Sequence, residues 1–258
     1  MSITVATWNV NSIRARMDRV LDWLRREKPD IVCLQELKVT TELFPLEPLE
    51  QMGYHCAVLG QKTYNGVAIL SLQPPEDIRR GMIDDAEQEQ ARLISARIGG
   101  LDILSAYFPN GSTVGSEKWE FKLRWIKRLR AELGARFDPS STVLLCGDFN
   151  IATDDGDVAK PDRWADTVLY HPIAREALAD LKSWGFEDIF RQKNPDGGIY
   201  SWWDYRAGAF HRNDGLRIDY LYATPSLATC CEQAWVDRDE RKGTRPSDHA
   251  PVLARFSL

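Results

Sequence analysis

Short apolar segments rich in β-branched residues recur along this chain, and helical stretches separate only some of them. The strand-like segments are ITVATW, DIVCLQE, YHCAVL, GVAILSL, RLISARI, LDILSAYF, TVLLCGDFN, IYSWW, LRIDYLYA, QAWVD and HAPVLARF. Helical spacing separates the first two, and further helices are expected over about 117–136 and near 172–184. Parallel neighbours need a crossover helix, whereas directly successive strands pair antiparallel. The pattern therefore predicts an α/β protein with mixed sheets.

The composition is that of an ordinary globular protein, with 43% hydrophobic and 28% charged residues in 258. Low-complexity linkers, repeats and composition breaks are absent, so we predict a single domain over residues 1–258. No apolar run approaches the roughly 18 to 20 residues that span a bilayer, and MSITVATWN lacks a signal-peptide pattern. The five cysteines lack zinc-ligand spacing, so reduced thiols and a cytoplasmic location are expected.

The net charge of −5 argues against a uniformly basic surface but does not exclude local phosphate-binding patches. Two segments are locally basic, SIRARMDRVLDWLRREK and KWEFKLRWIKRLRAELGAR, and both have helical apolar spacing. Charges in this pattern, Lys122 among them, usually form a solvated helix face, and that is our expectation.

Polar side chains follow several of the apolar runs, where each strand is expected to end. They are Asn9, Asn11, Gln35, Glu36, Lys38, Tyr107, Asn110, Asp148, Asn150, Asp248 and His249. Taken singly, a segment such as GDFN is most simply a turn, because Gly, Asp and Asn all favour turns. Taken together, residues at strand ends gather in one crevice, where ligands bind.

Asp219 is predicted to lie inside the apolar strand LRIDYLY, where an unpaired carboxylate is costly. His249 is its natural partner, since an Asp that orients a His recurs in catalytic sites. A serine-hydrolase site and a zinc site are excluded, because neither a G-x-S-x-G elbow nor His/Cys ligand spacing is present. The surplus of carboxylate and amide oxygens suits Mg²⁺, and phosphodiester hydrolysis uses such a metal with a base and an acid.

These segments together are similar to a known family. WNVNSIR, LQELK, NGVAIL, YFPNG, GDFNI, YSWWDYR, GLRIDYL and PSDHAPV resemble the exonuclease III branch of the endonuclease/exonuclease/phosphatase superfamily, nearly end to end and in the family's order. The resemblance implies a DNase I-like fold, a four-layer α/β sandwich of two mixed β-sheets flanked by helices. It also implies Mg²⁺-dependent cleavage of DNA phosphodiesters, with Mn²⁺ as a substitute, and it makes GDFN a catalytic strand end.

The resemblance assigns metal and catalytic roles by motif. Glu36 would be the principal metal ligand, with Asp248 nearby and Asn9 and Asn11 supporting the metal and phosphate region. Asp148 and Asn150 would orient and activate the attacking water and border the metal. His249, held by Asp219, would contact the scissile phosphate, and Tyr107 would assist the leaving group. One or two metal ions, and Asp148 or His249 as the base, both stay open.

The resemblance also assigns DNA contacts. The aromatic and basic segment IYSWWDYRAGAFHRNDGLRID would serve DNA recognition, because arginines and aromatic rings can pack into a groove and stack on bases. Trp202, Leu216 and Ile218 would line a pocket for an extrahelical abasic sugar. The implied contacts are Asn11, Arg14, Lys38, Asn110, Trp202, Trp203, Arg206, Phe210, Arg212, Leu216 and Ile218.

The implied function is a DNA repair nuclease, acting as a monomer on duplex DNA with nicks, 3′-blocked ends or abasic sites. It would combine 3′→5′ exonuclease, 3′-phosphatase and abasic-site endonuclease activities. The segment WADTVLYHPIAREAL departs from many relatives through the bulky Leu169, Tyr170 and His171, so we expect reduced abasic-site incision. The alternatives are a phosphatase of lipids or small phosphates, or a non-catalytic nucleic-acid-binding member; the latter would be expected to lose carboxylates that are all present here.

Overall fold

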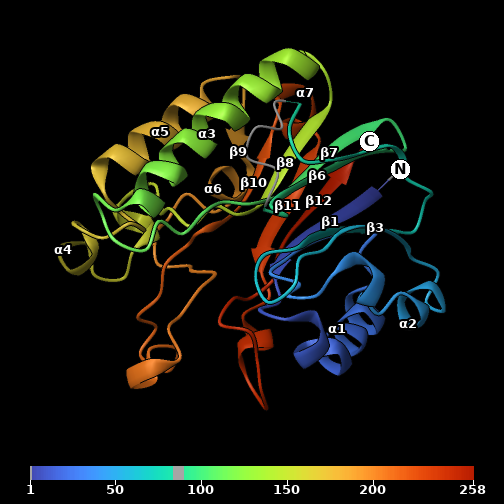
Figure 1. Ribbon diagram of the computed structural model, residues 1–258, viewed down its shortest axis with the longest axis horizontal. Coiled ribbons are helices and arrows are strands. Elements are labelled where there is room, and N and C mark those ends of the chain that lie inside the picture. Colours follow the sequence, from blue (N-terminus) through green and yellow to red (C-terminus); the bar gives the residue numbers. More distant parts are fainter. Residues whose placement is uncertain (1, 84–89) are drawn as a thin grey trace.

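Two six-stranded sheets form the centre of the structure, a computed structural model that describes residues 2–83 and 90–258 (Figure 1). The first sheet has the order β11-β12-β1-β2-β4-β3 and the second the order β5-β6-β7-β8-β10-β9. The first comprises β1 (Ser2–Asn9), β2 (Ile31–Gln35), β3 (His55–Leu59), β4 (Val67–Ser71), β11 (Cys231–Val236) and β12 (Val252–Ser257). The second comprises β5 (Glu76–Arg80), β6 (Leu93–Ile98), β7 (Leu101–Tyr107), β8 (Val143–Asp148), β9 (Glu187–Asp188) and β10 (Asp219–Ala223).

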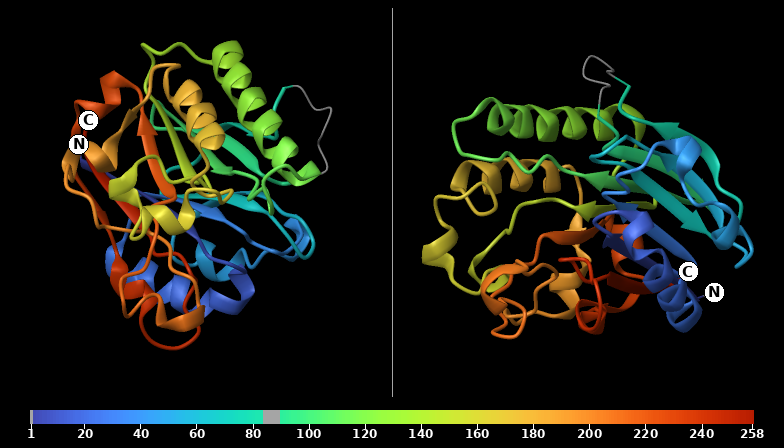
Figure 2. Two further views of the ribbon diagram at one scale, coloured as in Figure 1. Left: turned by 90° about the vertical axis from the view of Figure 1, so that its left-hand side faces the viewer. Right: turned by 60° about the horizontal axis from the view of Figure 1, so that its bottom comes forward.

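The helices are α1 (Ile13–Glu27), α2 (Glu47–Glu50), α3 (Glu117–Arg136), α4 (Pro161–Trp164), α5 (Pro172–Lys182), α6 (Ile189–Lys193) and α7 (Pro225–Ala228). The longer helices α1, α3 and α5 cover the two outer faces of the pair of sheets, whereas α6 and α7 pack against the core between the sheets. Figure 2 shows α3 and α5 side by side on one face, with α1 and α2 on the opposite side. The layers are therefore helix, sheet, sheet and helix, which confirms the predicted four-layer α/β sandwich.

The apolar runs of the sequence are explained by burial on both faces of each sheet. In β2, Ile31 and Cys33 face the core between the sheets, while Val32 and Leu34 pack in the core beneath α1. A strand with two buried faces needs apolar residues at successive positions instead of alternate ones. This is why DIVCLQ was recognisable as a strand.

Two crossover helices bring the strand ends to one edge. β1 and β2 are parallel and joined through α1, and β7 and β8 are parallel and joined through α3. Ser12 and Ser116 cap these helices, each accepting a hydrogen bond from a backbone N–H three residues on. Parallel strands end on the same side, so both crossover units direct the carboxyl ends of their strands toward a common edge of the sandwich.

Some elements differ from the prediction. β5 was not predicted, because all five of its residues are exposed and mostly polar, which leaves no apolar pattern. IYSWW was predicted as a strand, but Trp202 forms only isolated bridges with Leu216 and His249. Within the ranges that the structure describes, no helix combines the length and the apolar character needed to cross a bilayer.

Candidate active site

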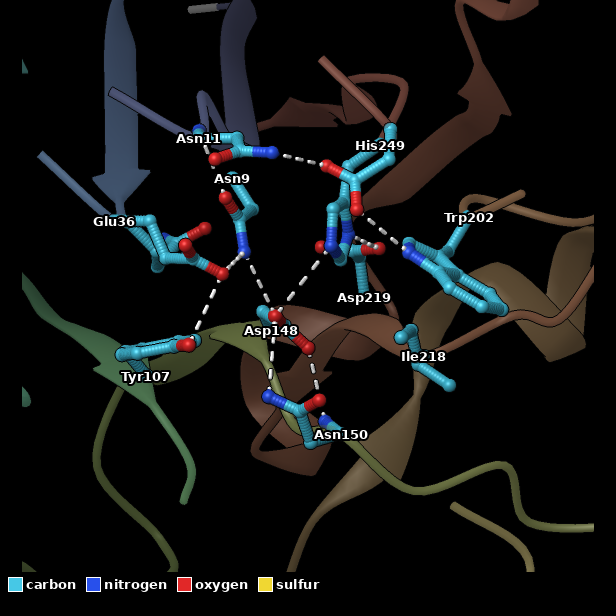
Figure 3. Close-up of polar contacts among 12 residues, drawn as sticks. Asn9, Asn11, Glu36, Tyr107, Asp148, Asn150, Trp202, Ile218, Asp219 and His249 are labelled. Carbon is cyan, nitrogen blue, oxygen red and sulfur yellow. Dashed lines mark hydrogen bonds and ion pairs between the residues drawn. The ribbon is translucent and has the colours of Figure 1, made fainter. Parts of the chain in front are cut away.

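The strand ends of both sheets meet at one edge and bring most of the predicted catalytic residues together (Figure 3). Asn9 ends β1, Glu36 follows β2, Tyr107 ends β7 and Asp148 ends β8, while His249 lies just before β12. Asp148, Asn9 and His249 are buried, and Glu36 and Tyr107 keep part of their surface open. The set is therefore largely buried, and Glu36 and Tyr107 are its partly open members.

Glu36, Asp148 and His249 each offer one ligand atom within 4.8 Å of the others. Asn9 lies between the two carboxylates, and its Nδ2 donates to Glu36 Oε1 at 2.8 Å and to Asp148 Oδ2 at 2.9 Å. The backbone N–H of Asn11 donates to Asn9 Oδ1, which fixes the orientation of this amide. Asn9 thus holds the two carboxylates close together as a donor, while its oxygen accepts from Asn11; its part in metal binding stays a prediction.

Asp219 and His249 form the predicted pair, with Asp219 Oδ2 2.9 Å from His249 Nδ1. Neither residue is more than 4% exposed. Ser201 completes the arrangement: its Oγ donates to Asp219 Oδ2 at 2.6 Å and accepts the backbone N–H of Asp219. The opposite edge of the imidazole ring points to Asp148, with Nε2 3.7 Å from Asp148 Oδ2. The imidazole therefore bridges two carboxylates.

Burial and charge shift the pKa values of this group. Burial, reinforced by the Asp219 and Glu36 carboxylates, raises the pKa of Asp148 to about 7, although His249 opposes the shift. Burial disfavours the charged ring of His249, but Asp219 and Asp148 outweigh it and raise the pKa of His249 to about 10. The two carboxylates therefore favour the charged ring of His249, and burial favours a proton on Asp148.

The GDFN segment owes its shape to close packing and to a left-handed turn. A Cβ added to Gly147 would lie 1.8 Å from the carbonyl oxygen of Ala106, so only glycine fits where β8 meets β7. Asn150 has φ 52°, a conformation that asparagine tolerates. Its Nδ2 donates to Phe108 O and to Asp148 Oδ2, at 3.1 and 3.2 Å, so Asn150 is a donor to Asp148. The turn interpretation of GDFN is therefore confirmed, and the catalytic interpretation stays a prediction.

Tyr107 donates its hydroxyl to Glu36 Oε1 at 3.0 Å. Burial, with Glu36 and Asp148 nearby, raises the pKa of Tyr107 well above its usual value, so the phenol stays protonated. Arg92 lies over its ring, 4.8 Å from the centroid, and donates to the Tyr107 carbonyl. Arg92 therefore fixes a site residue, a role that sequence reasoning missed because a strand-flanking arginine carries no distinctive signal.

Asp248 is turned away from the Glu36 and Asp148 carboxylates. Its Oδ1 accepts from Asn11 Nδ2 at 2.9 Å and its Oδ2 from Trp202 Nε1 at 3.0 Å. Burial opposes its ionisation, but His249 and these two donors hold the pKa of Asp248 below its usual value. With both oxygens engaged, Asp248 organises Asn11 and Trp202 in this structure, and its place near the metal stays a prediction.

Lys38 lies at the open side of the site, where its Nζ is 2.8 Å from Glu36 Oε2 and donates to Asn11 Oδ1 at 2.6 Å. Glu36 and Lys38 both adopt left-handed backbone conformations, with φ 53° and 54°. Non-glycine residues in this region cost of order 1–3 kcal/mol and cluster at functional sites. Two backbone hydrogen bonds stabilise this segment: the N–H of Leu37 donates to Gly66 O, and the N–H of Lys38 donates to Asn65 O.

The predicted DNA contacts fall into two groups. Asn110, Arg14, Arg206 and Arg212 are exposed, and Trp202 and Lys38 are partly exposed. Trp203 and Leu216 have no exposed surface and Ile218 has 1%, so in this structure they support the surface from below instead of contacting DNA. Phe210 is half-buried, lying edge-on to Trp203 and 4.3 Å from the Arg238 guanidinium. It anchors the loop to the body of the protein.

A cavity of about 470 Å³ opens beside Trp202. It is lined by Asn110, Ser112, Thr113, Val114, Trp164, Asp166, Thr167, Val168, Leu169, Trp202, Asp204 and Arg206. Trp164, which sequence reasoning did not single out, stands edge-on to Trp202 at 5.8 Å. Leu216 and Ile218 do not line this cavity, because they are buried beneath Trp202.

Of the bulky residues expected to crowd this cavity, only Leu169 lines it. The hydroxyl of Tyr170 bonds to Asp155, and His171 caps α5 by accepting the backbone N–H of Ile173. His171 also packs edge-on against Trp119, with ring centroids 5.2 Å apart. The expectation that His171 crowds the cavity is therefore wrong, and the expectation for Leu169 stands as a prediction.

The oxygens at this edge fit a hard divalent cation. Glu36 and Asp148 bring two carboxylates together beside a tyrosine and away from cysteine, and Mg²⁺ prefers one or two carboxylates with water and phosphate oxygens. The charged imidazole of His249 is a poor ligand, because both ring nitrogens carry a proton and offer no lone pair to a cation. Glu36 and Asp148 are the two residues best placed to hold such an ion.

Comparison with known proteins places this site in a family. The sequence matches the endonuclease/exonuclease/phosphatase family over residues 6–249. It is 37% identical to exodeoxyribonuclease III of Haemophilus influenzae, over 97% of this chain and 98% of that protein. The fold is similar to an AP endonuclease from Archaeoglobus fulgidus, with TM-score 0.97, 41% identity and coverage of 99% and 100% of the two chains.

A second solved structure is a 3′ phosphatase from Neisseria bound to a product DNA hairpin. Its TM-score is 0.95 at 37% identity, with 99% of this chain and 100% of that chain covered. The end-to-end coverage agrees with the continuous sequence of motifs and with the four-layer fold. This chain therefore belongs to the endonuclease/exonuclease/phosphatase family, within its exodeoxyribonuclease III and AP endonuclease branch.

Proposed function

We propose that this protein is a Mg²⁺-dependent DNA repair nuclease that hydrolyses phosphodiesters of duplex DNA. The observation that carries the proposal is the imidazolium of His249 held between Asp219 and Asp148 beside the Glu36 carboxylate. A charged donor, a carboxylate with a pKa of about 7 and a second carboxylate for a cation are the groups that hydrolysis of a phosphodiester requires.

Glu36 would be the principal ligand of the metal, with Asp148 beside it and free to act on the attacking water. A bound divalent ion would supply charge neutralisation at the phosphate oxygens and a template for substrate. Tyr107 donates to Glu36 and Asn9 donates to both carboxylates, so the chain fixes these oxygens before substrate arrives.

Asp148 acts as the base in this proposal. A water oxygen attacks phosphorus and its proton passes to Asp148. The bond from phosphorus to the leaving oxygen breaks, and the leaving oxygen keeps the bonding electron pair and takes a proton from solvent. Asn9 and Asn150 both donate to Asp148 Oδ2 and orient the carboxylate for this transfer. Burial raises the pKa of Asp148 above its ordinary value, which favours uptake of a proton by this carboxylate.

His249 stabilises the charge that develops on the phosphate oxygens. With its pKa raised to about 10, the ring is a cationic donor and a poor base at neutral pH. Asp219 and Ser201 hold the ring in place from its Nδ1 side, which leaves Nε2 directed toward the reaction centre. The choice between Asp148 and His249 as base is thereby resolved in favour of Asp148 in this proposal.

The proposed substrates are duplexes with a nick, a 3′-blocked end or an abasic site. The similarity to an exodeoxyribonuclease III, an AP endonuclease and a 3′ phosphatase supports this range. Because Leu169 lines the cavity beside Trp202, we propose that 3′-end trimming exceeds abasic-site incision. We further propose that the protein works as a monomer in the cytoplasm.

The test is incubation of the purified protein with nicked, 3′-phosphate and abasic duplexes, with Mg²⁺ and with EDTA. Cleavage or phosphate release from the first two substrates with Mg²⁺, abolished by EDTA and restored by added Mg²⁺ or Mn²⁺, is expected. Inactivity on all three DNA substrates with either metal, together with turnover of a lipid or small phosphate, would overturn the proposal.

A further inference from the structure

Lys122 is a charged side chain without exposed surface on the helix that covers the second sheet. It lies in α3 and is 0% exposed, whereas Lys118 and Lys127 of the same helix are exposed. The expectation of a uniformly solvated basic face is therefore wrong at this position. Removing an ammonium from water is costly unless its protons find partners, so its contacts indicate what it does.

The ammonium of Lys122 donates to three backbone carbonyls. Its Nζ lies 3.1 Å from Asn110 O, 2.8 Å from Asn150 O and 2.7 Å from Val168 O. A lysine ammonium has three N–H donors and no acceptor, so three carbonyls use its full donor capacity. Burial lowers the pKa of Lys122 to about 7. The three carbonyls nevertheless fit the charged form, because a neutral amine, with two N–H groups, would leave one of them without a donor.

Each carbonyl belongs to a different segment of the site. Asn110 lies between β7 and α3, Asn150 follows β8, and Val168 precedes α5 and lines the cavity beside Trp202. These loops leave regular strand pairing, so their buried carbonyls need donors from elsewhere. Lys122 therefore connects two strand-end loops with the loop that borders the cavity.

The connection reaches the catalytic carboxylate in two steps. Asn110 Nδ2 donates to Asn150 Oδ1 at 3.0 Å, and Asn150 Nδ2 donates in turn to Asp148 Oδ2. The loop is also shaped around the lysine, since a Cβ added to Gly111 would lie 3.1 Å from Lys122 Cδ. The backbone positions of Asn110 and Asn150 thus depend on the same ammonium group.

We propose that Lys122 is a positioning residue for hydrolysis, whose ammonium fixes the Asn110, Asn150 and Val168 carbonyls and so sets the orientation of Asn150 toward Asp148. The inference rests on the proposed nuclease function. Lys122 does not face substrate in this arrangement, and it acts through the loops that do. Its loss should impair turnover more than DNA binding, because a misplaced catalytic group lowers the rate of the chemical step.

The first experiment compares Lys122→Met with the matched Lys127→Met, in the same helix but at an exposed position. Initial rates on a nicked 3′-phosphate duplex give kcat and KM, and circular dichroism gives the folded fraction. For Lys122→Met, kcat per folded molecule should fall about 10- to 100-fold while KM changes less than about threefold. Lys127→Met should match wild type. If Lys122→Met does not fold, Lys122→Gln, which keeps two N–H donors, replaces it, and the same split is expected.

A second measurement does not depend on activity. The side-chain amide ¹⁵N–¹H signals of Asn110 and Asn150 should shift in the Lys122 variant of the metal-free protein and stay unchanged in Lys127→Met. If the wild type is active and the Lys122 variant keeps its kcat, the positioning role is overturned. Amide signals that do not change in the Lys122 variant overturn it as well. An inactive wild type instead contradicts the nuclease proposal, and the amide signals then decide the role of Lys122.

Discussion

Asp148 and Asp219 are cross-strand partners on the antiparallel strands β8 and β10, and the imidazole of His249 lies between their carboxylates. The register of one strand pair thus fixes the spacing of two carboxylates around one imidazole ring. Because all three side chains are nearly fully buried, their charges interact strongly, and the group should behave as a unit. The first two predictions follow from this relationship.

Asp148→Asn should abolish hydrolysis of every DNA substrate and leave DNA affinity close to wild type. The amide cannot accept the proton of the attacking water, and loss of a general base costs about 10²- to 10⁴-fold. Single-turnover rates and a Kd measured by fluorescence anisotropy test this prediction. A folded variant that keeps more than a few per cent of activity would show that Asp148 is not the base.

Asp219→Ala and His249→Ala should each cripple turnover, and the double variant should be little worse than either single variant. Asp219 acts by holding and charging the ring, so its removal has no further effect once His249 is gone. The measurement is a double-mutant cycle on kcat/KM. Multiplicative losses in the double variant would mean that Asp219 works independently of His249.

DNA affinity should fall steeply with salt despite the net charge of −5. Lys160, Arg163 and Arg212 surround the single Asp214 carboxylate at 2.6, 3.3 and 3.8 Å, and their side chains are 53%, 61% and 56% exposed. Three cations and one carboxylate leave a surplus of two positive charges for phosphates. Each phosphate contact contributes about −0.9 to the slope of log affinity against log salt.

The variant to compare is Lys160→Ala/Arg163→Ala, with Arg25→Ala/Lys127→Ala as a matched pair of exposed cations elsewhere. The first pair should make the slope shallower by about 1.8 if each residue contacts one phosphate, and the second should leave it unchanged. A wild-type slope near zero would favour the small-phosphate alternative over DNA.

Leu169→Gly should raise abasic-site incision relative to 3′-phosphate removal. An abasic sugar must leave the helix to enter a pocket, whereas a 3′ end at a nick is less constrained, so free volume beside Trp202 should matter more for the former. Relief of crowding is worth about 1–3 kcal/mol, or roughly 5- to 150-fold. His171→Ala is the control, since His171 packs on Trp119. Equal wild-type rates on the two substrates would remove the basis for crowding.

Asp157→Asn should destabilise the fold at neutral pH and less so in acid. Burial opposes ionisation of Asp157, but the buried Arg217 guanidinium holds the pKa of Asp157 below its usual value. The ionised group therefore stabilises the fold fully above the unfolded pKa of about 3.9, and this contribution is lost as pH falls through the lower folded pKa. Breaking such a pair costs about 3–5 kcal/mol.

Urea unfolding at several pH values checks this prediction, with the exposed Asp196→Asn as control. The difference in unfolding free energy between wild type and Asp157→Asn should shrink below about pH 4. A difference that is the same at pH 7 and pH 3 would mean that Arg217 does not depend on the Asp157 charge.

The sequence predicted those elements whose burial leaves a pattern. β2 and β8 were found because both of their faces are apolar, and the pairing of Asp219 with His249 was found because a carboxylate in an apolar strand needs a partner. β5 was missed because an exposed edge strand has no such constraint. Which face a residue presents was harder to predict than which element it occupies.

The orientation of individual side chains was the feature that the sequence predicted least well. Asn9 presents its nitrogen and not its oxygen to the carboxylates, because a backbone N–H from Asn11 occupies the oxygen. Trp203 lies inside the protein, while its neighbour Trp202 faces the cavity. Lys122 was predicted on a solvated face but is buried. Its helix packs against irregular loops, and the carbonyls of those loops accept the hydrogen bonds of the cation.

The central position of β1 has a consequence for synthesis of the chain. β1 hydrogen-bonds to β2 on one side and to β12 on the other. At the end of β1, the carbonyl of Asn9 accepts a hydrogen bond from the hydroxyl of Ser247. A growing chain can form the β1–β2 unit early, but one edge of β1 stays unpaired until Val252–Ser257 has been made. His249 reaches its partners at the same late stage. A nascent chain on the ribosome would therefore lack a complete site until nearly all of its length has been made.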